Sequence, residues 1–91
     1  MADQEIEARR IILYPVSGEK AFRLMEMENK LVFAVVKTAS KRTISKAVEE
    51  LYNVRVTKLN VVNTPKGIKK AYVQLAPENS AEDIATRLGV L

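Results

Sequence analysis

The stretch that decides the fold is LVFAVVKTASKRTISKAVEELYNVRVTKLNVV, residues 31–62. Residues 31–37 are rich in β-branched and aromatic side chains and predict a short strand. A helix is predicted next, because apolar side chains follow helical spacing at Ile44, Ala47, Val48, Leu51 and Tyr52. Ser40 is a suitable N-cap for this helix, and Asn53 suits the left-handed residue that ends it.

Residues 54–63 predict a second strand whose apolar pattern changes phase in the middle. Val54 and Val56 share one parity, whereas Leu59 and Val61 share the other. A β-bulge at residues 57–58 would bring all four to one face, because one extra residue shifts the pleat.

Outward from this unit, turn and breaker residues bound the remaining elements. Residues 64–67, Thr-Pro-Lys-Gly, predict a turn, and residues 70–75 a returning strand. Ser80 is a candidate N-cap for a last short helix that Gly89 ends. Upstream, residues 10–15 predict an edge strand stopped by proline, and residues 2–8 an acidic, fraying helix. A helix from Ser17 and Gly18 to about residue 28 precedes Asn29, which ends it.

These elements predict one α+β domain over residues 1–91 of the split β-α-β type. A right-handed crossover through the central helix makes the two flanking strands parallel, and the returning strand fits between them, antiparallel to both. The sheet then has three strands, or four if residues 10–15 join it, with helices on one face. The opposite face is expected to display Val32, Ala34, Val36, Lys70, Tyr72 and Gln74.

Composition excludes several classes of chemistry. The chain has 91 residues and contains neither cysteine nor histidine, so disulfides, thiol chemistry, imidazole catalysis and the usual zinc or haem ligation are absent. Glu49–Glu50 and Glu82–Asp83 are expected to be solvated, because neighbouring side chains on a helix diverge. No apolar run approaches a membrane span, and no signal segment is visible. We expect a cytoplasmic protein that is not an enzyme, with no metal, cofactor or small-molecule substrate and no membrane insertion.

Charge is segregated along the chain. Residues 29–75 carry ten basic and two acidic side chains, a net +8, whereas both flanks are net negative. A basic centre between acidic ends predicts a polyanion site. The alternative is the charged surface of a protein from a hot environment, in which both signs would intermix.

The candidate RNA-binding residues are basic side chains in three groups together with one aromatic ring. Lys41, Arg42 and Lys46 lie near the start of the central helix, where free backbone N–H groups add positive potential. Lys66, Lys69 and Lys70 surround the hairpin, Arg55 and Lys58 lie on the adjoining strand, and Lys37 follows the first strand. Each is alternatively a solvated side chain. Tyr72 is either a cross-strand packing residue or a surface on which a base or ribose stacks.

Several segments resemble the universal large-subunit ribosomal protein L-twenty-three family. PVSGEKA at residues 15–21 is similar to the family's P-x-x-[ST]-E-K-A segment, with Gly18 where Ser or Thr is usual. NKLVF (29–33) resembles its first strand, SKRTISKAVEELYNV (40–54) its central helix, and residues 60–65 with KKAYVQL (69–75) its hairpin. The resemblance covers most of residues 10–76, and the short hairpin loop looks like the archaeal form.

The resemblance implies a structural constituent of the large ribosomal subunit that binds its rRNA beside the polypeptide exit tunnel, among neighbouring ribosomal proteins. It also implies a docking surface for the signal recognition particle and the protein-conducting channel, with Glu19 as a factor contact. Carried over as RNA contacts are Lys20, Lys41, Lys46, Lys69, Lys70 and Tyr72.

Two other readings stay open from the residues alone. One is a free-standing RNA-binding module that uses the same sheet and binds short single strands. The other is a small enzyme or regulatory domain with a small-molecule ligand, which would need a concave polar site for which the sequence offers no convergent residues.

Overall fold

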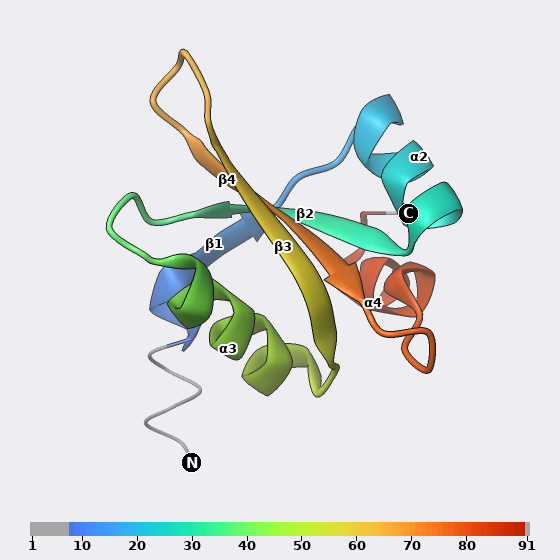
Figure 1. Cartoon of the computed structure of the whole chain (residues 1–91). Helices are drawn as coiled ribbons and strands as arrows, with labels where there is room; N and C mark the ends of the chain where they lie inside the picture. Colours follow the sequence, from blue (N-terminus) through green and yellow to red (C-terminus); the bar gives the residue numbers. More distant parts are fainter. Residues whose placement is uncertain (1–7, 91) are drawn as a thin grey trace.

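The computed structural model describes residues 8–90, and its centre is one antiparallel sheet of four strands in the order β1-β2-β4-β3 (Figure 1). The strands are β1 (Ile12–Pro15), β2 (Lys30–Val35), β3 (Val56–Asn63) and β4 (Lys69–Leu75). The helices are α2 (Glu19–Glu28), α3 (Lys41–Tyr52) and α4 (Ala81–Leu88). The predicted α+β class is confirmed, and residues 12–15 supply the fourth strand.

The β2-α3-β3 crossover has the predicted topology. β4 pairs antiparallel with both β2 and β3, so those two strands run parallel with β4 between them. The β3–β4 hairpin therefore returns the chain through the middle of the sheet. This arrangement carries the hairpin turn to the same end of the sheet as the start of α3 (Figure 1).

The core lies between the sheet and the helices α3 and α4. Phe33 of β2 and Val73 of β4 are fully buried on the inward face and belong to one core cluster with Ile44 and Val48 of α3. The rings of Phe33 and Tyr52 stack with centroids 5.6 Å apart and planes 10° from parallel, a geometry that contributes beyond buried area.

The β3 bulge is where the parity change predicts it. Val56 pairs with Leu75 but Lys58 pairs with Gln74, so β3 gains one residue relative to β4 at Thr57. As a result the apolar residues on both sides of the bulge pack against the core: Val54, Val56, Leu59 and Val61.

Five of the predicted helix ends are confirmed. The Ser40 Oγ accepts a hydrogen bond from the Thr43 amide, and Ser80 caps α4 in the same way. Asn29, Asn53 and Gly89 end their helices in the left-handed conformation. α2 begins at Gly18, where φ is 126° and no side chain caps the first turn.

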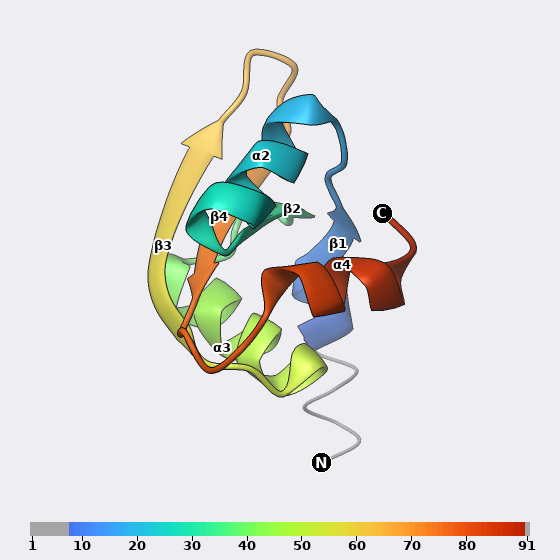
Figure 2. The ribbon, with the colours of Figure 1, turned by 90° about the vertical axis from the view of Figure 1, so that its right-hand side faces the viewer.

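α2 straddles an edge of the sheet, whereas α3 and α4 contribute their apolar stripes to the core (Figure 2). β1 is short and pairs only with Phe33–Val35, so the first half of β2 has β4 on one side and no strand on the other. Met25 reaches the core cluster from α2, whereas Leu24 lies with Lys70 and Tyr72 on the other side of the sheet. Ala21 lies between them and lines hollows on both sides. Because β1 is short, α2 can pack along the open side of β2, a position that the apolar stripe of α2 alone did not predict.

Three local predictions need correction. Arg10 and Ile11 are helical, so the edge strand begins at Ile12. β2 ends at Val35, and Val36 packs against the core because strand alternation stops there. Most of the acidic segment predicted over residues 2–8 lies outside the described residues.

Candidate nucleic-acid interface

The hairpin turn projects from one end of the sheet. The Gly67 amide donates to the Thr64 carbonyl at 3.0 Å, and Gly67 takes a φ of 80°, as the predicted turn requires. The Thr64 Oγ1 also bonds the backbone of Ile68, which closes the loop on itself. Lys66 is exposed at the tip of this ordered turn.

Lys69 joins the hairpin to the loop before α3. Its Nζ donates to the Ala39 carbonyl at 2.6 Å and to the Lys37 carbonyl at 3.2 Å. The Lys37 ammonium lies beside the hairpin, only 3.4 Å from where a Cβ at Gly67 would stand. Lys41 follows two residues after Ala39. We call Lys37, Lys41, Lys66 and Lys69 the hairpin-end cluster.

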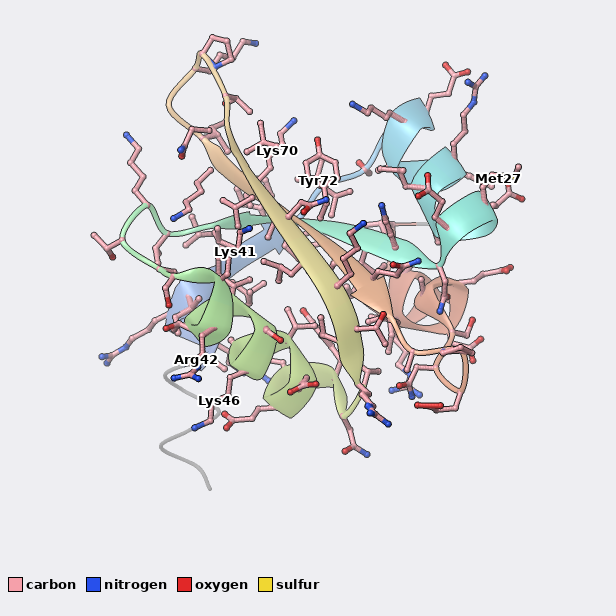
Figure 3. All side chains as sticks on the ribbon, in the orientation of Figure 1. Met27, Lys41, Arg42, Lys46, Lys70 and Tyr72 are labelled. Carbon is pink, nitrogen blue, oxygen red and sulfur yellow. The ribbon has the colours of Figure 1, made fainter. Side chains whose placement is uncertain are left out.

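Arg42 and Lys46 extend positive charge along α3 (Figure 3). Both are exposed and line a groove of about 330 Å³, which Glu50 shares one turn further along the helix. Figure 3 draws them on the side of α3 away from Lys70 and Tyr72. The α3 residues therefore flank the hairpin-end cluster and do not continue onto the sheet face.

The sheet face opposite the core carries Lys58, Lys70 and Tyr72, as strand alternation predicts. Tyr72 is half-buried, and the Lys20 Nζ lies 5.8 Å from its ring centroid. The same face does not display Val32 and Ala34, which are 5 % and 0 % exposed. α2 lies beside Val32, and the longer side chains of Tyr14 and Lys70 flank Ala34 in register.

Arg55 is not brought into this arrangement. It precedes β3 at the end of the strand opposite the hairpin, and its amide donates to the Asn79 Oδ1. Because β3 has eight residues, Arg55 lies about 25 Å along the strand from the turn. The basic side chains thus form a band over one end and one face of the sheet, with Arg55 separate.

No carboxylate within residues 8–90 makes an ion pair with any of the basic residues predicted to bind RNA. The ion pairs between residues of this part of the chain join Arg23 to Glu19 at 3.4 Å, both exposed, and Lys30 to Glu28 at 3.0 Å. Exposed cations without carboxylate partners leave a net positive potential that attracts a polyanion.

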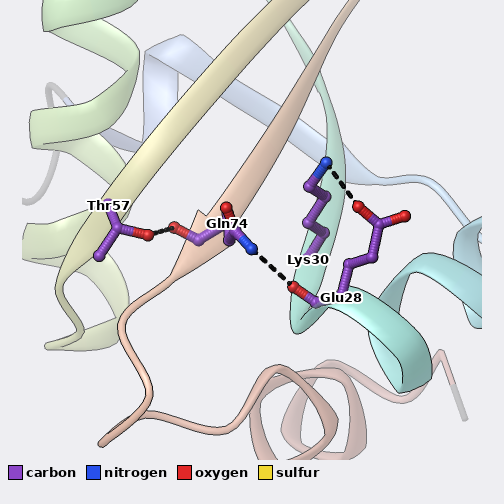
Figure 4. A network of polar contacts seen from close by, with 4 residues as sticks. All are labelled: Glu28, Lys30, Thr57 and Gln74. Carbon is purple, nitrogen blue, oxygen red and sulfur yellow. Dashed lines mark hydrogen bonds and ion pairs between the residues drawn. The ribbon is translucent and has the colours of Figure 1, made fainter.

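The Lys30–Glu28 pair belongs to a polar network that ties α2 to the sheet (Figure 4). The Gln74 Nε2 donates to the Glu28 carbonyl at 3.2 Å, and the Gln74 carbonyl accepts from the Thr57 Oγ1 at 3.3 Å. Gln74 therefore bridges β3, β4 and the end of α2, a structural role that its predicted place on the open face did not indicate.

Sequence reasoning also missed the apolar side chains that stay exposed. Leu13 and Tyr14 of β1, Phe22 and Met27 of α2, and Val62 of β3 are between 39 % and 81 % exposed. Strand parity alone would place Tyr14 on the same face as the buried Ile12, but the register shift between them pairs Tyr14 with Ala34 and leaves its ring exposed. Phe22 and Met27 fall outside the helical stripe of α2.

Within the described residues, no group of acidic side chains is placed to hold a metal ion. No helix between residues 8 and 90 has the length and apolar content needed to cross a membrane.

Within residues 8–90, this small α+β domain carries a band of cations without carboxylate partners and an aromatic ring on its sheet, a combination typical of proteins that bind structured nucleic acid. The sequence profile of the family described as Ribosomal protein L23 matches residues 10–83. The "Large ribosomal subunit protein uL23" of Pyrobaculum aerophilum is 52 % identical over 76 residues, which cover 84 % of this chain and 94 % of that protein. The protein of the same name from Methanococcus aeolicus is 45 % identical over 85 residues, or 93 % of this chain and 99 % of that protein. The chain belongs to the ribosomal protein L23 family.

Proposed function

We propose that this chain is a structural constituent of the large subunit of the cytoplasmic ribosome and binds its rRNA through the hairpin-end cluster and the basic start of α3. The observation that carries the proposal is the set of cations without carboxylate partners in the described part of the chain. Family membership supports the assembly, because both similar archaeal proteins are named as proteins of the large ribosomal subunit.

Binding on this proposal is electrostatic and depends on shape. Lys66 at the hairpin tip and Lys41 at the start of α3 are exposed, so they contact phosphates without rearranging the core. Lys37 lies against the hairpin and adds charge to the same end of the sheet. Phosphate contacts do not distinguish one base sequence from another, so specificity comes from the folded shape of the RNA that the hairpin fits.

The position beside the exit tunnel and the docking of factors form a second part of the proposal. Glu19, in the first turn of α2, is exposed and pairs with Arg23 across one helical turn. Exposed apolar side chains on the same helix, Phe22 and Met27, would give a factor such as the signal recognition particle an apolar contact beside this charged pair. The protein-conducting channel is the second factor proposed for this surface.

Co-sedimentation tests the assembly. A tagged full-length chain, expressed in the host that makes it, should travel with large subunits in a gradient and stay bound at physiological salt. Arg87→Gln, which changes one exposed charge on α4, is the matched control and should behave like the unchanged chain. Release of the unchanged chain to the top of the gradient at modest salt would contradict the proposal.

A further inference from the structure

A hollow of about 210 Å³ opens between the start of α2 and the open face of the sheet. It is separate from the hairpin-end cluster, because its walls come from the β1–α2 linker, α2, β2 and β4. The hollow forms where the chain leaves β1 and crosses over the sheet to α2. The Val16 amide, which donates to the Val32 carbonyl at 2.8 Å, fixes that crossing.

The hollow is lined by apolar side chains, by two lysines and a tyrosine, and by Ser17, Gly18 and Glu19 at the start of α2. The Glu19 carboxylate pairs with Arg23 at 3.4 Å. Val16, Ala21, Leu24 and Val32 line the inside. Around them stand the ring of Tyr72 and the side chains of two lysines, Lys20 from α2 and Lys70 from β4. Neither lysine has a carboxylate partner in the described part of the chain.

An aromatic ring beside two ammonium groups can bind a ligand that has a flat aromatic ring and negative charge next to it. Nucleobases stack on tyrosine rings, and the phosphates on either side of an unstacked base pair with nearby lysines. The Lys20–Tyr72 contact keeps an ammonium close to the ring. If a base stacked on this ring, its flanking phosphate would therefore lie near the Lys20 ammonium.

The size of the hollow limits the occupant further. Pockets that enclose drug-sized ligands measure about 300–1,000 Å³, so this one is suited to a single ring system and not to a nucleotide pair or a helix. We propose that the hollow between Lys20, Lys70 and Tyr72 receives one base that the bound RNA extrudes from its stack, with both lysines on the flanking phosphates. This inference rests on the proposed function, because the base belongs to the same rRNA.

The test compares binding of the purified full chain and its variants to protein-free large-subunit rRNA. Tyr72→Val suits a strand but removes the ring, and it should weaken binding about tenfold or more while leaving the dependence on salt unchanged. Tyr72→Phe keeps the ring and should bind within about twofold of the unchanged chain. Lys70→Gln should reduce the slope of log affinity against log salt by about one, because one phosphate contact is lost.

Ultraviolet crosslinking supplies a readout that does not depend on the stability of a variant. Tyr72 of the unchanged chain should crosslink to one nucleotide of the rRNA, and Tyr72→Phe should crosslink at the same nucleotide. Binding by Tyr72→Val at full affinity, or crosslinks scattered over many nucleotides, would overturn the inference while RNA binding by the chain still stands. Failure of the unchanged chain to bind the rRNA would overturn the proposed function, and this inference with it.

Discussion

The side chain of Asn29 makes four hydrogen bonds where α2, β4 and α4 meet. Asn29 ends α2 with a φ of 55°, and its Nδ2 lies within 3.3 Å of the carbonyl oxygens of Leu75, Ala76 and Asn79. Its Oδ1 accepts from the Ala81 amide at 2.8 Å. One side chain therefore holds the end of β4 and the start of α4 against the β2 edge.

Replacing Asn29 separates the backbone contribution from the side-chain contribution. Asn29→Ala should lower the free energy of unfolding by about 3 kcal/mol, because partly buried backbone groups lose partners and a β-carbon enters the left-handed region. Asn29→Gly loses the same hydrogen bonds without the backbone strain, so its loss should be about 1 kcal/mol smaller. Urea unfolding followed by circular dichroism measures both. Equal losses for the two variants would contradict the backbone part of the argument.

Tyr52 couples stability to alkaline pH. Burial raises the pKa of its phenol above the ordinary value of 10.0, and the nearby Arg9 guanidinium lowers it in part. The unfolded chain gives up this proton at lower pH than the folded chain does. The contribution of Tyr52 is therefore fully present below about pH 10 and is lost as the pH rises through the raised value.

Tyr52→Phe keeps the ring that stacks on Phe33 but removes the titrating group. Its free energy of unfolding, measured in urea between about pH 9 and 11, should fall less steeply with pH than that of the unchanged chain. Other tyrosines and lysines titrate in both proteins, so the difference between the two curves reports Tyr52. Parallel curves would show that the phenol titrates alike in folded and unfolded chains.

At the scale of elements, the joint between the hairpin and α3 depends on Lys69. Its ammonium satisfies two carbonyl oxygens of the loop at residues 37–39. Lys69→Met keeps the aliphatic stem and should lower the free energy of unfolding by about 1–2 kcal/mol, because hydrogen bonds from a charged donor are lost. Lys66→Met at the hairpin tip is the matched control and should change it by less than about 0.5 kcal/mol. If the two variants lowered the free energy of unfolding equally in thermal or urea unfolding, the structural role of Lys69 would be contradicted.

The elements also show what the sequence could and could not predict. The bulge followed from the parities of Val56 and Leu59, and the ends of α3 followed from Ser40 and Asn53, because each depends on local geometry. The place of α2 depends on how far β1 extends along β2, which is a tertiary fact. The hydrogen bond from Lys69 to a loop thirty residues away and the contact of Lys20 with Tyr72 could not be predicted from the sequence for the same reason.

At the scale of the whole molecule, the charge segregation of the sequence becomes a band over the hairpin end and one sheet face. The residues from 29 to 75 form β2, α3, β3 and β4 and the loops that join them, so folding gathers most of their charge. Arg55 and Lys30 are the exceptions. Antiparallel pairing sends the start of β3 to the other end of the sheet, and Lys30, at the start of β2, pairs with Glu28. The sequence predicted that this surface is positively charged, and the topology determined which basic residues lie on it.

The measurement that tests the central claim most directly is the salt dependence of binding to protein-free large-subunit rRNA. For the unchanged chain, log affinity should fall linearly with log salt. The triple variant Lys37→Gln, Lys41→Gln and Lys66→Gln leaves Lys69 in place and should reduce that slope by about 2–3, since each phosphate contact contributes about 0.7–0.9. Arg87→Gln should leave the slope unchanged. The account is contradicted if the triple variant keeps the full slope and affinity, because the hairpin end would then carry none of the phosphate contacts.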